Sequence, residues 1–388
     1  MKVAVVGLGS TGSMALWLVS RMPGVTAVGF EQFGIGHPHG GYSGESRLFR
    51  TVYHEGEKYI PLLARARTLW SKLERASGRR IFHDYGVLTV GRESDAAFAR
   101  LRESARTHRL AHERLGTAAL RARYPQLDIA DDEVGLLDVG GGALRPELGV
   151  ISAIEAARRE GAAVREHEAV GAIVQAGHGV DLITASGSQH FDRVIVTAGS
   201  WSKLLVPEIA DLTETRRIVL TWFVPRDAGA YSPEALPCFI RDRDGFHVFG
   251  APIVDGYSAK ISRDVEGPLD VDRPENMSLR VEPEDLSAFG ARVQRLFPGV
   301  LPEPVRYSAH HDSFTSDKTP IIDSRRDVIV VAGLSGHGFK LAPALGEIAA
   351  QLAVDGVAPL RPPDFSIAAH APVHPRTPPR PDLRGARE

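Results

Sequence analysis

A glycine motif close to the first residue restricts both the fold and the ligand of this chain. Residues 3–12 read VAVVGLGSTG, an apolar run that continues directly into G-x-G-x-x-G. Such a run predicts a buried strand that turns at Gly7 and becomes a helix. Gly9 then lets phosphate groups approach the backbone, and Gly12 lets the helix pack closely on the strand. Because glycine triplets also occur by chance in loops, the prediction depends on the flanking sequence.

The sequence on both sides agrees with a βαβ unit. Residues 13–21 have the apolar spacing of a helix, and Met-Pro-Gly at 22–24 ends it. Residues 25–30 form a second apolar strand that ends at Glu31, about 20 residues after the motif, where a carboxylate accepts hydrogen bonds from an adenosine ribose. This segment alone leaves open whether the dinucleotide is NAD or FAD. The residues predicted to hold it are Gly7, Gly9, Ser10, Thr11, Gly12 and Glu31.

Composition argues against several kinds of partner. A chain of 388 residues with 43% hydrophobic and 24% charged residues is typical of a globular protein with two or three domains. Its formal charge of −2 gives no reason to expect a nucleic acid or an anionic membrane as partner. Cys238 is the only cysteine, so we expect no internal disulfide and no metal site. Since the chain shows neither an apolar run of about 20 residues nor a signal peptide before the glycine motif, we expect a cytoplasmic protein.

The sequence pattern changes near residue 211 from alternating helices and strands to successive short strands, which are typical of an antiparallel sheet. We therefore predict an α/β (α+β) fold, in which a Rossmann-like nucleotide-binding domain carries an inserted antiparallel-sheet substrate domain. The predicted boundaries are 1–83, 141–210 and 317–362 for the first domain, and 84–140 and 211–316 for the second. Residues 96–124 are predicted to be helical. Residues 363–388, rich in proline and arginine, are predicted to be a disordered tail.

Four segments taken together resemble the monomeric sarcosine oxidase and N-methyltryptophan oxidase family of FAD-dependent amine oxidases, within the D-amino-acid oxidase superfamily. They are residues 7–12, SRLFR at 46–50 with Tyr53, VIVTAGSW at 194–201, and AGLSGHGFK at 332–340. The last segment is the most specific of the four. The resemblance implies that the dinucleotide is FAD, and the family fold agrees with the two domains predicted independently.

The resemblance also implies roles for four cationic residues. An arginine and a lysine at the positions of Arg50 and Lys340 bind the substrate carboxylate in the family, and two cations suit one carboxylate. Arg47 corresponds to an arginine near the flavin ring. Lys260 corresponds to a lysine near flavin N5 that promotes the reaction of reduced flavin with O₂, because a fixed cation stabilises superoxide. The alternatives are a surface ion pair for Arg50 and solvent-facing side chains for the two lysines.

Further contacts follow from the same resemblance. Substrate contacts are expected from Arg50, Tyr53 and Lys340. Cofactor contacts beyond the first glycine motif are expected from Ser43, Ser46, Arg47, Val170, Ala198, Gly199, Trp201, Gly333, Gly336, His337, Gly338, Phe339 and Lys340.

The chain departs from the family at the point of flavin attachment. The family usually tethers FAD through a cysteine before the last core strands, and alignment on residues 321–323 places His310 there. Cys238 lies elsewhere in the chain. We therefore favour noncovalent FAD, and the alternative is a histidyl link through His310.

A second departure concerns the substrate pocket. Family positions with aromatic or imidazole side chains correspond here to Phe249, Asp264 and Asp312. If these aspartates face the substrate, it is larger or more cationic than sarcosine. The alternative is that both aspartates pair with nearby arginines such as Arg263 or Arg306.

These observations predict an FAD-dependent oxidase of a carboxylated amine, a secondary or primary amino acid. The C–N bond is oxidised to an imine, and O₂ is reduced to H₂O₂. One alternative is a flavin dehydrogenase that passes electrons to another carrier. Another is a flavin-binding subunit that resembles the β subunit of multi-subunit sarcosine oxidases. The expected partners are the small-molecule substrate and O₂, with the protein a monomer or a homodimer.

Overall fold

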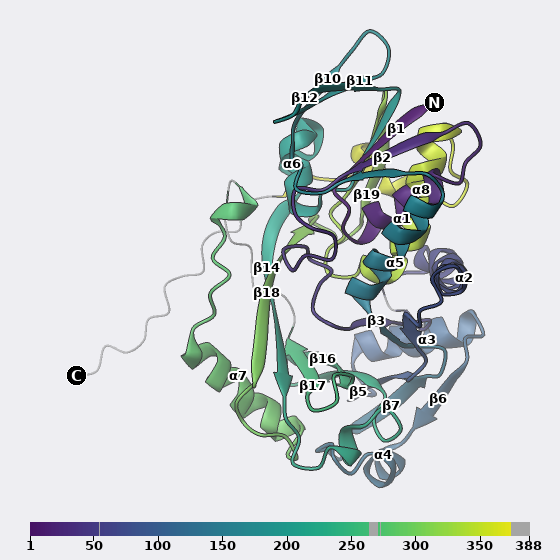
Figure 1. Ribbon diagram of the computed structural model, residues 1–388. Coiled ribbons are helices and arrows are strands. Elements are labelled where there is room, and N and C mark those ends of the chain that lie inside the picture. The colour runs from purple at the N-terminus through teal and green to yellow at the C-terminus, as the bar shows by residue number, and fades with distance from the viewer. Residues whose placement is uncertain (54, 264–270, 272, 374–388) are drawn as a thin grey trace.

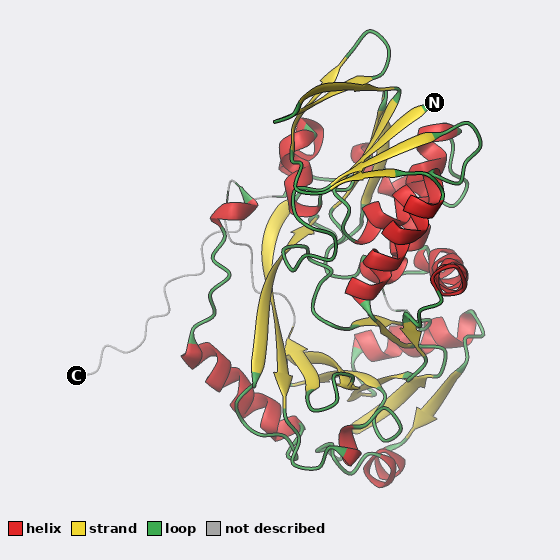
Figure 2. Ribbon diagram, in the orientation of Figure 1, coloured by secondary structure: helices red, strands yellow, loops and turns green. Residues whose placement is uncertain are grey.

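A six-stranded sheet forms the upper part of the molecule in Figures 1 and 2. The structure is a computed structural model that describes residues 1–53, 55–263, 271 and 273–373. The strand order is β19-β20-β13-β1-β2-β9, and every neighbouring pair is parallel except β19 and β20. The strands are β1 (Lys2–Val6), β2 (Thr26–Phe30), β9 (Ala163–Arg165), β13 (Arg193–Val196), β19 (Ile321–Arg325) and β20 (Val328–Ala332).

Strand β1 is buried because both faces of this sheet are covered. Val3 and Val5 pack into one core with the helices, whereas Ala4 and Val6 pack into another with a small antiparallel sheet. The helices are α1 (Ser10–Val19), α2 (Tyr59–Ser77), α5 (Pro146–Arg159) and α8 (Ala342–Val354). The small sheet consists of β10 (Val170–Gln175), β11 (Val180–Thr184) and β12 (Gly187–Phe191). This two-sided burial accounts for the uninterrupted apolar run at the start of the chain.

An eight-stranded sheet forms the lower part (Figure 2), in the order β18-β14-β17-β16-β15-β5-β7-β6. It is antiparallel except between β15 and β5. The strands are β5 (Val87–Arg92), β6 (His112–Leu115), β7 (Glu133–Asp138), β14 (Glu214–Phe223), β15 (Cys238–Arg243), β16 (Phe246–Ile253), β17 (Ala259–Arg263) and β18 (Arg306–Phe314), and α7 (Pro283–Leu296) packs beside them. The predicted fold class is confirmed, whereas the domain boundaries stay a prediction.

A three-stranded sheet completes the described strands. It contains β3 (Arg47–Phe49), β4 (Phe82–His83) and β8 (Gly142–Leu144) in the order β3-β8-β4. In Figure 1, β3 lies between the two large sheets. Two of the four predicted cationic site residues, Arg47 and Arg50, belong to β3 or follow it directly, so the chain carries them to this junction.

The prediction of one helix over residues 96–124 is wrong. The segment contains α3 (Ala96–Thr107), strand β6 and α4 (Thr117–Arg123). Arg109 adopts a left-handed backbone with φ of 52°, which ends the first helix. Residues of β6 then pair with β7 at the edge of the eight-stranded sheet. The periodicity of residues 96–124 gave no sign of this pairing, because the partner strand lies outside that segment, beyond α4.

The predicted disordered tail is wrong for residues 363–373. Two 3₁₀ turns, Pro363–Phe365 and Ile367–Ala369, are present there, and the Phe365 side chain is fully buried. Its ring lies 5.9 Å from the Tyr59 ring of α2. Lys58 forms an ion pair with Asp364 beside it. Burial of the Phe365 side chain thus gives this segment a defined structure despite its proline-rich composition. Residues 374–388 lie outside the described part of the chain.

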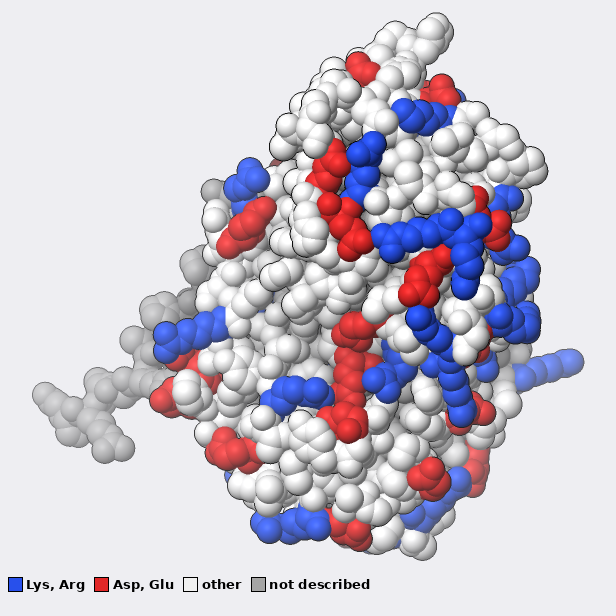
Figure 3. All heavy atoms as spheres, viewed as in Figure 1, with Lys and Arg blue, Asp and Glu red and all other residues white. Residues whose placement is uncertain are grey.

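Among the described helices, none has the length and apolar character needed to cross a bilayer. Within the same residues, no cluster of three or more His, Cys, Asp or Glu side chains could hold a metal ion. On the face shown in Figure 3, acidic and basic side chains lie close to one another rather than forming separate areas of one sign.

The burial of Phe365 predicts that the segment after α8 contributes to stability. Phe365→Ala should lower the free energy of unfolding by about 3 kcal/mol, because a large buried ring leaves a cavity. Val357→Ala is the control, since this side chain is 66% exposed and lies in the same segment. Thermal unfolding of both variants measures the difference, and equal melting temperatures would contradict the assigned packing.

Candidate active site

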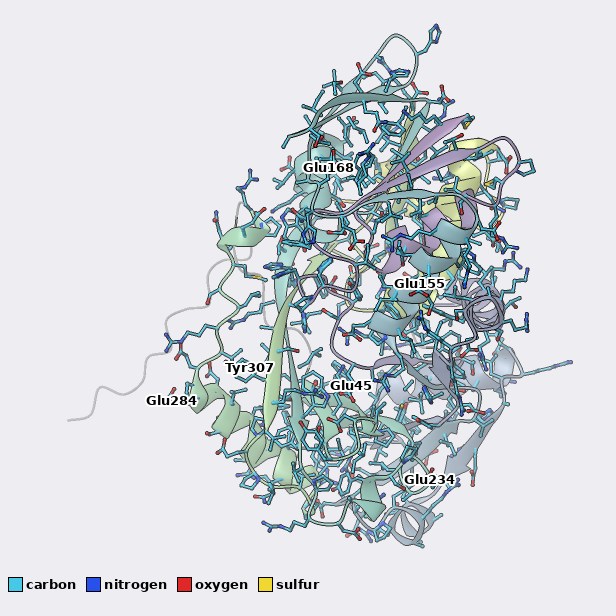
Figure 4. All side chains as sticks on the ribbon, viewed as in Figure 1. Glu45, Glu155, Glu168, Glu234, Glu284 and Tyr307 are labelled. Atoms are coloured by element: carbon cyan, nitrogen blue, oxygen red, sulfur yellow. The ribbon has the colours of Figure 1, made fainter. Side chains whose placement is uncertain are left out.

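A cavity of about 720 Å³ extends from the six-stranded sheet to the eight-stranded sheet. At one end it is lined by the β1–α1 turn and by Glu31, which follows β2. At the other end it is lined by residues of β14, β15 and β16. Glu168, labelled in Figure 4, lies on the wall at the end near the six-stranded sheet. The cavity therefore connects the region predicted to bind the dinucleotide with the region predicted to bind the substrate.

Close backbone contacts shape the β1–α1 turn. Gly7 has a φ of 86°, and a Cβ there would lie 2.6 Å from the Cα atom of Ala198, at the end of β13. A Cβ on Gly12 would lie 1.8 Å from the carbonyl oxygen of Gly7. Neither position can therefore carry a side chain without moving the turn. Gly12 does not line the cavity; it acts by letting α1 approach β1.

The start of α1 has donors for an anion. The helix begins at Ser10 without a side-chain cap, so its first amide groups face the cavity end of the turn. Thr11 lines the cavity, and its buried hydroxyl oxygen makes no hydrogen bond to any described residue. Free backbone N–H groups at a helix N-terminus, together with a free hydroxyl, fit the pyrophosphate of a dinucleotide.

Glu31 is 4% exposed and reaches back to the glycine turn. Its carboxylate accepts hydrogen bonds from the backbone N–H of Leu8 at 2.8 Å and of Phe33 at 3.0 Å. These bonds fix the carboxylate on the cavity wall at the carboxyl end of β2, where an adenosine ribose is expected.

A second glycine-rich segment, residues 333–338, follows β20 and forms another part of the wall. Its backbone is left-handed at Gly333, Ser335 and Gly336, with φ of 64°, 53° and 80°. The Gly336 N–H donates to the Asp312 carboxylate at 2.7 Å, and the Ser335 hydroxyl donates to the Gly333 carbonyl at 2.9 Å. Such a backbone suits close approach of a flat ring, as the prediction of cofactor contacts in this segment requires.

Arg50 and Lys340 are both buried on the cavity wall, 8% and 5% exposed. Arg50 forms an ion pair with Glu55 at 2.5 Å. The Lys340 ammonium donates to the His337 carbonyl at 2.9 Å and to the Tyr53 hydroxyl at 3.3 Å. Both cations also lie over the Tyr53 ring, at 4.7 Å for Arg50 and 5.1 Å for Lys340. Burial, and then the nearby Arg50 charge, lower the pKa of Lys340 to about 7.

A chain of hydrogen bonds holds Lys340 in place. His337 Nε2 lies 2.8 Å from the carbonyl oxygen of Lys318, which can only accept, so Nε2 carries the proton. Nδ1 then accepts from the Tyr53 hydroxyl at 2.9 Å, and the Tyr53 oxygen accepts from Lys340. Burial lowers the pKa of His337 to about 4, so the ring is neutral at physiological pH. Tyr53 does not line the cavity and acts on it through Lys340.

Arg47 and Lys260 bind the same carbonyl oxygen. The Arg47 guanidinium lines the cavity and donates to the carbonyls of Ser46, at 2.9 Å, and Gly41, at 3.1 Å, and also to Ser43. Lys260 is 3% exposed and donates to the carbonyls of Ser46 at 2.8 Å and Gly44 at 3.0 Å. Burial, and then the Arg47 charge, hold the pKa of Lys260 well below its ordinary value. Among the described residues the cavity wall includes Arg47 but not Lys260.

The structure brings most of the predicted site residues to one cavity. Those that line the cavity are Gly7, Gly9, Ser10, Thr11, Glu31, Arg47, Arg50, Val170, Ala198, Gly199, Trp201, Phe249, Asp312, Gly333, Gly336, His337, Gly338, Phe339 and Lys340. The residues that lie behind the wall are Gly12, Ser43, Ser46, Tyr53, Lys260 and His310. Asp264 lies outside the described residues. The roles assigned to these residues stay predictions.

His310 points away from the cavity, and both of its ring nitrogens are engaged. Nδ1 lies 2.9 Å from the Pro38 carbonyl, and Nε2 lies 2.8 Å from the Ser308 hydroxyl. The next residue, His311, lines the cavity instead, with its ring edge 5.2 Å from Trp201. His311 is the first of four consecutive residues of β18 that line the cavity, 311–314, and the role of His310 stays a prediction.

The Asp312 carboxylate lines the cavity without a basic partner. Besides the Gly336 N–H, it accepts the backbone N–H of Ser313 at 2.8 Å. Within the described part of the chain, no arginine, lysine or histidine forms an ion pair with it. Arg306 pairs instead with Glu45 at 2.7 Å and Asp255 at 3.3 Å. Burial raises the pKa of Asp312 to about 6.

Apolar side chains that the sequence did not indicate line the end of the cavity at the eight-stranded sheet. They are Leu48, Ile218, Leu220 and Ile240, which join the predicted Phe249, with His247 also on the wall. The alternation of apolar and polar residues along these strands predicted that each strand has a buried and an exposed face. It did not predict which face lines the cavity. Glu55, the partner of Arg50, was also missed, because a lone glutamate in a loop carries no sequence signal.

Comparison with known proteins agrees with this geometry. The model of the family DAO, FAD dependent oxidoreductase, matches residues 2–352. The chain is 34% identical over 359 residues to N-methyl-L-tryptophan oxidase of Salmonella dublin, covering 90% of this chain and 94% of the relative. It is 33% identical over 362 residues to monomeric sarcosine oxidase of Streptomyces avermitilis, covering 91% and 94%.

Solved structures show the same fold at lower identity. A variant of NikD, an unusual amino acid oxidase essential for nikkomycin biosynthesis, superposes with a TM-score of 0.83 at 22% identity, covering 95% of this chain and 96% of that one. Glycine oxidase from Geobacillus kaustophilus gives a TM-score of 0.80 at 18% identity, covering 95% and 98%. The match of the family model over nearly the whole cavity-forming chain, together with the two curated relatives, identifies the dinucleotide as FAD. The chain belongs to the DAO family and is an FAD-dependent amine oxidoreductase.

Proposed function

We propose that the protein oxidises an amino acid, secondary or primary, whose carboxylate binds Arg50 and Lys340. The observation that carries this proposal is that both cations line the cavity while buried against the ring of Tyr53 behind them. Arg50 offers a planar, permanently charged fork, and Lys340 offers a point charge, so together they bind a carboxylate strongly. Both curated relatives carry the names of amino-acid-type amine oxidases, which supports this class of substrate.

The residues of the cavity fit FAD. The β1–α1 turn, the free Thr11 hydroxyl and Glu31 would hold the dinucleotide part, and residues 333–338 with Arg47 would lie beside the flavin ring. When bound, FAD supplies the two-electron oxidation of the substrate C–N bond to an imine, which water hydrolyses. The protein orients the substrate by its carboxylate and keeps the site enclosed.

The apolar end of the cavity restricts the rest of the substrate. Leu48, Ile218, Leu220, Ile240 and Phe249 offer no partner for a charged side chain, and burial of an unpaired charge is costly. We therefore propose that the substrate carries an apolar group on its nitrogen or its α-carbon. An apolar group is thus favoured here over a cationic side chain, and Asp312 accepts its hydrogen bonds from the backbone of Gly336 and Ser313.

The pKa of Lys340 predicts how carboxylate binding depends on pH. With a pKa of about 7 in the free enzyme, Lys340 is charged below pH 7 and becomes neutral above it. Affinity for propionate, a carboxylate without an amine, should therefore fall as the pH rises through 7. Lys340→Met should remove this pH dependence and lower the affinity for propionate at least about tenfold, because the buried carboxylate of the ligand then loses the Lys340 ammonium as a partner.

Titration of flavin absorbance in the holoenzyme measures this binding. Lys72→Met, which changes an exposed lysine on α2, is the control and should behave as the unmodified protein. Unchanged propionate affinity in the Lys340 variant would contradict the proposed carboxylate site.

We propose O₂ as the electron acceptor and H₂O₂ as the product. Lys260 supports this, because its ammonium lies behind the wall residue Arg47 and shares the Ser46 carbonyl with it. A fixed cation there would stabilise developing superoxide. Lys260→Met should slow reoxidation of the reduced flavin by O₂ about 100-fold, while anaerobic reduction by substrate changes little. Stopped-flow measurement of both half-reactions separates them.

Slow reoxidation of the unmodified protein by O₂ would favour the dehydrogenase alternative. The fold itself does not distinguish the two, since the L-proline dehydrogenase from P. horikoshii has a TM-score of 0.81 to this chain. Turnover by the purified chain alone would argue against the role of a subunit in a larger complex.

We propose that FAD is bound noncovalently. Cys238 is buried with a pKa raised to about 12 by burial, and His310 uses both ring nitrogens in hydrogen bonds. Acid precipitation of the purified protein should leave a yellow supernatant and a colourless pellet. A yellow pellet would contradict the proposal. If the pellet of the His310→Ala variant were then colourless, the covalent link would be a histidyl link through His310.

A further inference from the structure

The loop directly before β3, residues 44–46, binds two cations through its carbonyl oxygens. The Lys260 ammonium donates to the carbonyls of Gly44 at 3.0 Å and Ser46 at 2.8 Å. Arg47 donates to the same Ser46 carbonyl at 2.9 Å. The position of the Lys260 ammonium therefore depends on what holds this loop.

A carboxylate from another element holds the amide side of the loop. Glu147, in the first turn of α5, accepts the N–H groups of Gly44 at 2.6 Å and Glu45 at 3.2 Å with its Oε1 atom. The peptide group between Gly44 and Glu45 thus donates to Glu147 through its N–H and accepts from Lys260 through its C=O. Hydrogen bonds joined in this way through one polar group strengthen each other.

This shared peptide group limits the distance between the two charges. Two hydrogen bonds of 3.2 Å and 3.0 Å, joined by one C–N and one C=O bond, place the Glu147 Oε1 atom at most about 9 Å from the Lys260 Nζ atom. Lys260 is 3% exposed and Glu147 is half-buried. Because Lys260 is removed from water, the carboxylate stabilises its charged form at this separation.

A second carboxylate near Lys260, that of Glu45, has other partners. It pairs with Arg306 at 2.7 Å, and burial and then Asp255 raise its pKa. Among the described residues, no arginine, lysine or histidine forms an ion pair with Glu147. Although burial opposes it, hydrogen bonds from backbone N–H groups hold the pKa of Glu147 below its ordinary value. Glu147 is therefore the carboxylate whose charge remains available to Lys260.

The other ionisable groups around Lys260 do not favour its charged form. Two of them are cations and two are neutral near pH 7. These are, in that order, Arg47, Arg306, His310 and Cys238. Burial lowers the pKa of His310 to about 4 and raises that of Cys238 to about 12, whereas the two arginines keep their charge. Without the Glu147 carboxylate, burial and the two cations would favour a neutral Lys260.

We propose that Glu147 is a positioning residue, which keeps Lys260 in place and protonated through residues 44–46 and so sustains the reaction of reduced flavin with O₂. The inference rests on the proposed function, in which Lys260 is the cation that stabilises superoxide, and it adds the residue that maintains this cation. No proton is transferred in this role, because the Lys260 ammonium acts as a fixed charge. The alternative is that Glu147 serves only the N-terminus of α5, where a carboxylate is favourable.

A titration of Lys260 itself tests this role without turnover. The chain contains seven lysines, so ¹³C labelling of lysine Cε gives a small set of NMR signals, and Lys260→Met identifies the signal of Lys260. Glu147→Gln removes the charge but keeps an oxygen that can accept the same two N–H groups. In the oxidised holoenzyme, this variant should lower the pH midpoint of Lys260 by about one unit, because a nearby negative charge favours the ammonium.

Glu155→Gln is the matched control. Glu155 (Figure 4) lies about two turns further along α5 and pairs with Arg79 at 2.8 Å, so this variant should leave the Lys260 midpoint unchanged. Stopped-flow reoxidation by O₂ should slow as the pH rises through the midpoint of Lys260, and in Glu147→Gln this pH profile should shift by the same amount. Below both midpoints the variant and the unmodified protein should reoxidise at the same rate. Added to Lys260→Met, Glu147→Gln should have no further effect on this rate.

Each outcome separates the inference from the proposed function. An unchanged Lys260 midpoint in Glu147→Gln assigns Glu147 to the fold alone and overturns the inference, while slow reoxidation of Lys260→Met would still support O₂ as the acceptor. A shifted midpoint with an unshifted reoxidation profile contradicts the proposed role of Lys260, and the inference fails with it. A Lys260 that is neutral at pH 7 in the unmodified protein overturns both, and this measurement does not depend on the folding of any variant.

Discussion

Four cationic side chains, three of them buried and Arg47 half-buried, lie around one cavity, and the cost of removing their charges from water governs the site. Arg47, Arg50, Lys260 and Lys340 all lie at the junction of the two large sheets. Arg50 has a carboxylate partner in Glu55, whereas the other three donate to backbone carbonyls. Carbonyl oxygens satisfy the donors but do not neutralise the charge, so these side chains remain able to attract an anion. Anionic ligands, the FAD pyrophosphate and a substrate carboxylate, are what such a cavity binds favourably.

The fold maintains this arrangement with backbone that is costly to form. Glu45 has a left-handed conformation with φ of 69°, although it is not glycine. Its carboxylate is held by Arg306 at 2.7 Å and by the Trp222 indole, and it lies beside the β14–β18 pair (Figure 4). This conformation directs the carbonyls on either side, those of Gly44 and Ser46, to Lys260. Such strain persists only where surrounding contacts support it, and at Glu45 those contacts come from Arg306 and Trp222.

Several parts of the site could be predicted because they depend on local backbone. The turn at Gly7 needs a positive φ and close contact with Ala198, and both follow from a strand that runs directly into a helix. The segment 333–338 could be recognised for the same reason. By contrast, the resemblance aligned His310 with the point of flavin attachment, and the cavity wall on this strand begins one residue later, at His311. Which residues at the end of a strand reach a cavity depends on the neighbouring elements, and spacing alone does not resolve it.

The sequence by itself determined the βαβ unit, the mixed architecture, the family and the identities of the buried cations, because these depend on local periodicity and on short motifs. Only the tertiary structure decided which carboxylates pair with those cations. Glu55 meets Arg50, Glu45 meets Arg306, and Asp312 is left facing the cavity. The hydrogen-bond chain from Lys318 through His337 and Tyr53 to Lys340 likewise joins segments that are far apart in the sequence. Such pairings depend on distances between side chains from separate elements, and those distances exist only once the two sheets have packed around the cavity.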